Sequence, residues 1–155
     1  MRVKHVVAIL CVAAVTAFAA QHSSFSGTWE LNPGKSKNLG MMAQMKMSVA
    51  VDQSEASLDV TTRTTFQGRD DDRKTHYDLT GRAANNESPM GGPAETVSRW
   101  DGEKLVTTWT SESAVAGGPK VVRTETRSLS ADGKTMTVES VRGSNPPLVM
   151  VFDKK

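Results

Sequence analysis

Cysteine is almost absent from this sequence, and its single copy, Cys11, lies in an apolar N-terminal run. A chain cut after that run has no disulfide and no thiol for nucleophilic or metal chemistry. Histidine is also scarce, with three copies. The sequence contains no catalytic triad, zinc or phosphate-loop motif. We therefore predict that the protein is not an enzyme, with no catalytic residues, no metal site and no cofactor.

The first residues have the pattern of a secretory signal. Arg2 and Lys4 precede the apolar run Val6–Val15, and Ala17-Phe18-Ala19 gives the small-x-small pattern before a signal peptidase site. The apolar run is shorter than the roughly 20 residues of a membrane span. We predict export to the periplasm or the extracellular space, with no membrane span in the mature form. The predicted boundaries are 1–19 for the signal peptide and 24–155 for a single domain.

The charge balance gives no sign of a nucleic-acid partner. The chain has 19 basic and 17 acidic residues, and removal of Arg2 and Lys4 with the signal leaves 17 of each. A near-neutral chain lacks the basic face that nucleic-acid binding needs. We expect a monomer that binds no nucleic acid.

Apolar and aromatic residues are sparse, at 37% and 5% of the chain. Without the signal the apolar share falls to roughly 31%, below that of an ordinary globular domain. Threonine, a β-branched strand former, replaces many of the missing apolar residues. A thin core with strong strand propensity suits a small closed sheet whose interior is partly polar or hollow.

Alternation of apolar and polar residues indicates strands. It is clearest in 58–66, where Leu58, Val60 and Phe66 share one face. Asp101-Gly102 is a favoured turn for a two-residue hairpin. About nine short strands joined by turns predict an all-β antiparallel up-and-down meander, closed into a small β-barrel of about eight to ten strands. The first and last strands are the natural partners for closure, which removes exposed edges.

Three stretches are predicted to lie mostly outside the strands. Gln67–Arg73 is expected to be a solvated hairpin end, because calcium loops place their acids at alternate positions and these acids are adjacent. Ala83–Pro93 is expected to be the longest loop, and Asn32–Gln44 mostly loop. A methionine cluster at the end of the last stretch either fills the core or adapts to a ligand. Its members are Met41, Met42, Met45 and Met47.

The opening of the predicted domain, Phe25–Leu31, carries a family signal. Trp29 and Leu31 fall on one side of a strand, and we predict that Trp29 plugs the floor of the barrel. Phe25-Ser26-Gly27-Thr28-Trp29-Glu30-Leu31 resembles the opening F-x-G-x-W-x-L of fatty-acid-binding proteins, and Gly27-Thr28-Trp29 matches the lipocalin G-x-W. The chain thus resembles the calycin superfamily, and in particular small secreted bacterial lipocalin-like proteins. The resemblance implies a barrel with an internal pocket.

The chain departs from the family pattern at its last predicted strand. Fatty-acid-binding proteins usually end with R-x-Y, which grips the ligand carboxylate. The matching place here is Met150-Val151-Phe152, which has neither the charge nor the hydroxyl. The lipocalin disulfide is absent as well. The resemblance therefore implies a pocket, without that means of carboxylate capture.

We predict a lipocalin-like protein that binds a small apolar or amphipathic ligand inside the barrel. The alternative is a solid-cored barrel that acts as a structural or interaction module of the cell envelope. Arg123, Glu125 and Arg127 alternate on one strand face, either as a charged outer face or as an inward cluster for a charged ligand group. The predicted ligand-binding residues are Trp29, Phe66, Tyr77, Trp109, Met136 and Arg127.

Overall fold

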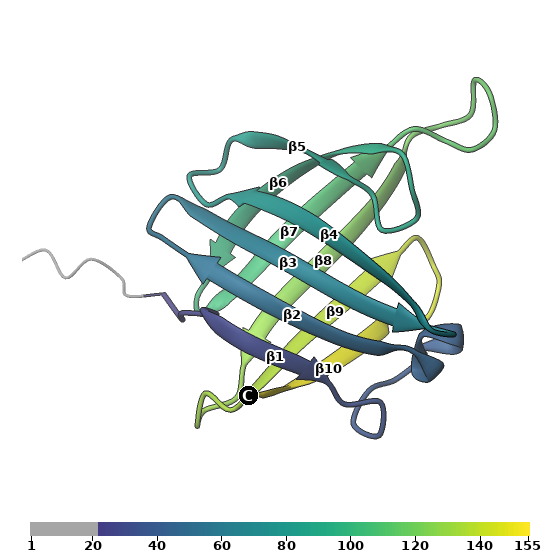
Figure 1. Ribbon diagram of the computed structural model, residues 1–155. Helices are drawn as coiled ribbons and strands as arrows, with labels where there is room; N and C mark the ends of the chain where they lie inside the picture. The colour runs from purple at the N-terminus through teal and green to yellow at the C-terminus, as the bar shows by residue number, and fades with distance from the viewer. Residues whose placement is uncertain (1–21) are drawn as a thin grey trace, which may run out of the picture.

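The computed structural model describes residues 22–155 and shows ten antiparallel strands in one curved sheet (Figure 1). The predicted all-β up-and-down barrel is confirmed, and the predicted signal peptide lies outside the described residues. The strands are β1 (Gly27–Leu31), β2 (Lys46–Gln53), β3 (Ser57–Phe66), β4 (Arg69–Asp78), β5 (Ala83–Glu87), β6 (Pro93–Asp101), β7 (Lys104–Ser111), β8 (Val121–Leu129), β9 (Thr135–Arg142) and β10 (Leu148–Lys154).

The barrel is nearly closed. The strand order is β4-β3-β2-β1-β10-β9-β8-β7-β6-β5, so the first and last strands pair as predicted. The ends of the sheet are β4 and β5, which follow each other in the chain. Within residues 22–155, no backbone ladder joins these two strands. We call the boundary between these two strands the β4–β5 seam.

The prediction of a polar turn over Gln67–Arg73 was wrong. The turn is the two residues Gln67 and Gly68, both with positive φ (49° and 77°), as a tight hairpin requires. The acidic run continues as β4, paired with β3. Asp72 lies opposite Arg63, whose Nε and Nη2 each donate to the Asp72 carboxylate at 2.9 Å. A charged residue such as Asp72 is thus compatible with strand structure here because it has a partner on the neighbouring strand.

The prediction of a long loop over Ala83–Pro93 was also wrong. Residues Ala83–Glu87 form β5, which pairs along its length with β6. Asn85 and Asn86 carry no apolar alternation, so the strand depends on its pairing and not on its own pattern. The loop itself is limited to residues 88–92.

The stretch between β1 and β2 is mostly loop, as predicted. It contains a 3-10 helix, η1 (Gly40–Gln44), and a single β-bridge between Lys37 and Val149 that ties the loop to β10. None of the helical structure in the described part of the chain is long and apolar enough to cross a membrane.

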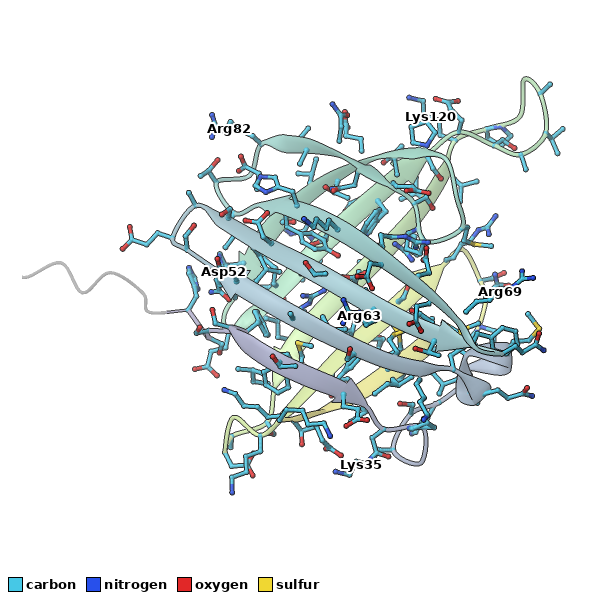
Figure 2. All side chains as sticks on the ribbon, viewed as in Figure 1. Lys35, Asp52, Arg63, Arg69, Arg82 and Lys120 are labelled. Carbon is cyan, nitrogen blue, oxygen red and sulfur yellow. The ribbon has the colours of Figure 1, made fainter. Side chains whose placement is uncertain are left out.

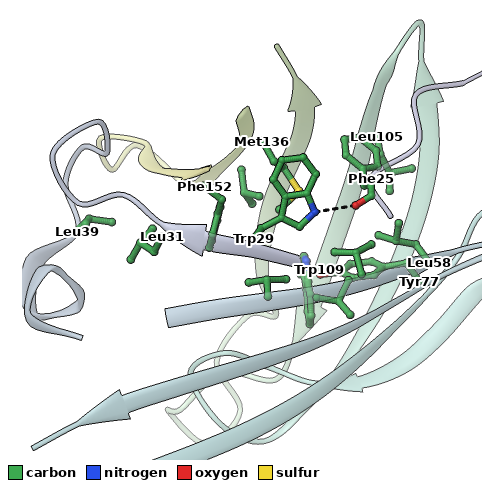
Figure 3. Packing of buried hydrophobic residues seen from close by; sticks show 14 of the residues in the cluster. Phe25, Trp29, Leu31, Leu39, Leu58, Tyr77, Leu105, Trp109, Met136 and Phe152 are labelled. Carbon is green, nitrogen blue, oxygen red and sulfur yellow. Dashed lines mark hydrogen bonds between the residues drawn. The ribbon is translucent and has the colours of Figure 1, made fainter. Parts of the chain in front are cut away.

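Buried apolar residues line the interior of the barrel, and those around Trp29 and Phe25 pack together at one end (Figure 3). Trp29 is 0% exposed there, and its indole N–H donates to the Phe25 carbonyl at 2.9 Å. The Phe25 N–H donates in turn to Gln53 Oε1 at 2.8 Å. The segment before β1 therefore belongs to the core and seals this end, which we call the closed end.

The outer surface of the barrel is strongly charged. Lys35, Arg82 and Lys120 are exposed (Figure 2), and each forms an ion pair with a carboxylate. The end opposite the core carries η1, the β3–β4 turn and the β9–β10 loop (Figure 1). We call this end the mouth.

Candidate functional site

A cavity of about 500 Å³ extends through the barrel between the apolar core and the mouth. Pockets for small ligands commonly have volumes of about 300–1,000 Å³. The barrel is therefore hollow, unlike the solid-cored alternative. The residues that line the cavity are Met42, Met45, Met47, Val49, Val60, Thr62, Thr64, Phe66, Arg69, Asp71, Arg73, Thr75, Tyr77, Pro89, Trp109, Arg123, Glu125, Arg127, Met136, Val138, Leu148, Met150 and Phe152.

Methionines form much of the mouth. Met42 lies on η1, and Met45 caps the C-terminal end of η1 with an extended backbone. Met47 lies two residues further along an extended backbone, and all three line the cavity. Flexible thioether side chains at an opening adapt to apolar ligands of different shapes.

The structure brings five of the six predicted ligand-binding residues to the cavity wall. The sixth, Trp29, is not among the lining residues, because it is packed in the core with its N–H bonded to Phe25. The lining residues of the predicted set are Phe66, Tyr77, Trp109, Arg127 and Met136.

Sequence reasoning missed the lining residues on the first half of β4. Arg69, Asp71 and Arg73 all point into the cavity. Counting back from Tyr77 in steps of two along an extended strand reaches these three residues, which places them on the same face. The assumption of a turn over Gln67–Arg73 concealed it.

The alternation on β8 faces inward. Glu125 and Arg127 are 7% and 5% exposed, and both line the cavity with Arg123. Arg127 Nη2 donates to Glu125 Oε1 at 3.1 Å, and the Tyr77 hydroxyl donates to the same oxygen at 3.2 Å. Arg123 Nη2 lies 4.0 Å from Glu125 Oε2, which is an electrostatic contact too long for a hydrogen bond. We call Arg123, Glu125 and Arg127, with Tyr77 and Trp109, the arginine cluster.

The arginine cluster has more donors than acceptors. Four buried nitrogen atoms have no hydrogen-bond partner within residues 22–155. A buried donor left without an acceptor costs about 1–3 kcal/mol, and more if it is charged. The two guanidinium groups also outnumber the single carboxylate. The unpaired atoms are Trp109 Nε1, Arg123 Nη2, Arg127 Nε and Arg127 Nη1.

Aromatic rings hold the two arginines in place. The Arg123 guanidinium carbon lies 4.6 Å from the centroid of the Trp109 ring, and that of Arg127 lies 5.3 Å from the Tyr77 centroid. The Tyr77 and Trp109 rings meet edge to face, with centroids 5.9 Å apart and planes at 85°. Cation–π contacts of this kind stabilise a desolvated cation and fix its orientation.

Tyr77 acts as a donor in this cluster. Burial raises the pKa of its phenol, and the nearby Glu125 carboxylate raises it further. The hydroxyl therefore stays protonated and available to Glu125 across the physiological pH range. No group of three or more His, Cys, Asp or Glu residues in the stretch 22–155 is arranged to hold a metal ion.

The barrel matches solved structures of fatty-acid-binding proteins. One is described as the REP1-NXSQ fatty acid transporter, with a TM-score of 0.64 and 14% sequence identity over 84% of this chain and 95% of that one. Another is fatty-acid-binding protein 1 of Echinococcus granulosus, with a TM-score of 0.63 and 15% identity over 84% of this chain and 96% of that one. The likeness shows that this chain shares the barrel fold of these proteins.

The buried charge inside this barrel comes from β8 and not from β10. Met150 and Phe152 of β10 line the cavity as apolar residues, and β8 supplies the two buried arginines. No protein-family model matches the sequence, and a search of curated proteins finds no match either. At 14% and 15% identity the likeness concerns the fold, so function has to be argued from the cavity itself.

Proposed function

We propose that the barrel binds a small amphipathic molecule with an acidic head and an apolar tail. The observation that carries this proposal is the set of four unpaired donors in the arginine cluster. A carboxylate offers about four lone-pair sites on two oxygens, so one acidic head can satisfy donors from Arg123, Arg127 and Trp109 together. Buried charges are stable when they are paired, and the ligand supplies the missing negative charge.

The rest of the cavity suits the tail of such a molecule. The wall between the arginine cluster and the mouth includes Phe66, Phe152 and Met150, followed by the methionines of the mouth. The charged lining residues add to the attraction for an acid, since four are arginines and two are carboxylates. They are Arg69, Asp71, Arg73, Arg123, Glu125 and Arg127.

The structural neighbours agree with this class of ligand. Both are described by their titles as proteins that transport or bind fatty acids. We propose by analogy that this chain carries an acid with an apolar tail and is not an enzyme. We further propose that it acts as an exported monomer.

Displacement of the neutral dye Nile red by dodecanoate and by dodecanol tests the proposal, because the two molecules share a tail and differ in the head. We expect the wild-type chain to prefer dodecanoate by at least about tenfold, or about 1.4 kcal/mol. Arg127→Met should abolish this preference and leave the affinity for dodecanol within about twofold, since the apolar wall is kept. The matched control is Arg99→Met, which removes an exposed arginine from β6.

A second variant separates head recognition from folding. Arg127→Met leaves the Glu125 carboxylate buried without its partner, which is costly. The double variant Glu125→Gln/Arg127→Met removes that charge and should show the same loss of preference. Equal binding of dodecanoate and dodecanol by the wild-type chain, or binding of neither, contradicts the proposed function.

A further inference from the structure

One side chain bridges the β4–β5 seam by hydrogen bonds to the β4 backbone. The Asn86 amide on β5 accepts a hydrogen bond from the His76 backbone N–H at 2.9 Å and donates one to the His76 carbonyl at 2.7 Å. The same amide donates to Thr96 Oγ1 on β6 at 2.8 Å. The Asn86 side chain therefore bonds the β4 backbone in the way that the backbone of a paired strand would. We call these contacts the Asn86 latch.

A groove of about 450 Å³ lies along the seam on the outside of the barrel. Its lining comes from β3, β4 and β5, and includes the exposed residues Lys74 and Glu87. Val60 and Thr75 line both this groove and the internal cavity. The groove and the cavity thus share a wall at these two residues.

The arginine cluster lies directly behind the seam. Tyr77 follows His76 on β4, and Trp109 on β7 is the register partner of Thr96, which the latch contacts. The Tyr77 and Trp109 rings touch inside the barrel and so bridge the two sides of the seam. The unpaired Trp109 Nε1 belongs to one of these two rings, whereas a route from the mouth first passes the methionines.

We propose that the β4–β5 seam is the passage through which the acidic ligand enters and leaves, with the Asn86 latch holding it shut. The inference rests on the proposed function. Opening the seam breaks the latch and the side-chain contacts of Tyr77 with Trp109, Glu125 and Arg127, whereas any other pair of neighbouring strands is joined by a continuous backbone ladder. Segments with few such contacts open at the lowest free energy. The charged residues Asp70, Asp72 and Lys74 keep the open edge of β4 from pairing with another chain.

Cross-linking the seam tests the passage. Lys74→Cys and Glu87→Cys, in a Cys11→Ser background, place two thiols in the groove that a short bismaleimide can join. We follow the exchange of dansyl-labelled undecanoic acid, a fluorescent acidic amphiphile, by stopped flow. The cross-link should slow association and dissociation at least about tenfold each and leave the dissociation constant within about twofold, because a gate changes rates and not end states. Asn86→Ala should speed both rates.

The matched control joins two strands that already share a ladder. Glu95 on β6 and Thr110 on β7 are register partners, so cross-linked Glu95→Cys/Thr110→Cys should keep wild-type rates. Wild-type exchange rates in the cross-linked seam variant overturn the passage. A chain that binds neither dodecanoate nor the dansyl acid overturns the proposed function instead.

Hydrogen exchange gives a readout that needs no ligand. The His76 amide is bonded to Asn86 and not to a strand, so we expect it to exchange faster than bonded amides of the β2–β3 ladder. Asn86→Ala should accelerate exchange at His76 and leave that ladder unchanged. Equal protection of His76 and the ladder amides in the wild-type chain contradicts a seam that opens locally.

Discussion

The guanidinium of Arg123 stacks on the ring of Trp109 at 4.6 Å, and each residue carries a buried N–H group without an acceptor. The two residues are register partners on β7 and β8, so this stack is fixed by the sheet itself. A preorganised pair of donors of this kind loses little conformational entropy when an acceptor arrives. This preorganisation supports the proposed binding of an acidic head by the arginine cluster.

Glu125→Gln should strengthen the binding of an acidic ligand. The Glu125 carboxylate now takes one donor of Arg127 at 3.1 Å and competes with any incoming anion. Removing its charge leaves both arginines for the ligand, so we expect the affinity for dodecanoate to rise by about three- to tenfold. The affinity for dodecanol should stay constant. Weaker binding of dodecanoate to this variant contradicts the assigned competition between Glu125 and the ligand head.

Trp29 should contribute to stability and not to ligand affinity. Trp29→Phe removes the N–H that pairs with the Phe25 carbonyl at 2.9 Å in a fully buried site. The unpaired carbonyl should lower the free energy of unfolding by about 1–3 kcal/mol, measured by urea denaturation followed by circular dichroism. Trp100→Phe, at a half-buried indole, is the control and should cost less. A change in ligand affinity with no change in stability contradicts this assignment.

The sequence predicted those strands whose own residues alternate. The run 58–66 shows a clear apolar face, and the structure places β3 at Ser57–Phe66. Trp109 and Met136 were predicted from the sequence to bind a ligand inside the barrel, and both line the cavity. Alternation of apolar and polar residues is sufficient to predict a strand where one face is buried and the other faces solvent.

The missed features depend on partners distant in the sequence or on charges that face inward. The first half of β4 has charged residues on both faces, so its hydropathy has no period, although Arg73 lines the cavity and Asp72 pairs with Arg63. Strand β5 forms because β6 supplies its hydrogen bonds. The latch of Asn86 on His76 joins two backbones through one side chain, which no local pattern reveals. The sequence likewise left open whether Arg123 and Arg127 of β8 face inward or outward, because the charges that face inward there show no apolar pattern.

Stability should depend on pH through Asp153. Asn32 Nδ2 and Lys35 Nζ donate to its carboxylate at 2.6 and 2.7 Å, and these hydrogen bonds lower the pKa of Asp153. A lowered pKa in the folded state stabilises the fold above the unfolded value of about 3.9. This contribution is lost as the pH falls through the folded pKa.

Asp153→Asn should therefore destabilise the protein at neutral pH and have little effect in strong acid. Urea denaturation at a series of pH values measures the difference from wild type. The control is Asp52→Asn, which changes an exposed carboxylate on β2 (Figure 2). A stability difference for Asp153→Asn that stays constant from neutral to strongly acidic pH contradicts the assigned contribution.

We predict that the N-terminal segment directs export of the protein and is then cleaved. The fold makes contacts from residue 22 onward: His22 stacks on Trp100 with ring centroids 4.2 Å apart, and Gln53 Nε2 donates to the Ser23 carbonyl at 3.1 Å. A mature chain that begins at Ala20 or Gln21 keeps these contacts and the Phe25 seal of the closed end. N-terminal sequencing and native mass spectrometry of protein expressed with its own leader should find that start in a monomer outside the cytoplasm. Ala19→Arg should block processing, because signal peptidase needs a small residue there. Recovery of the wild-type chain uncleaved from the cytoplasm contradicts the prediction.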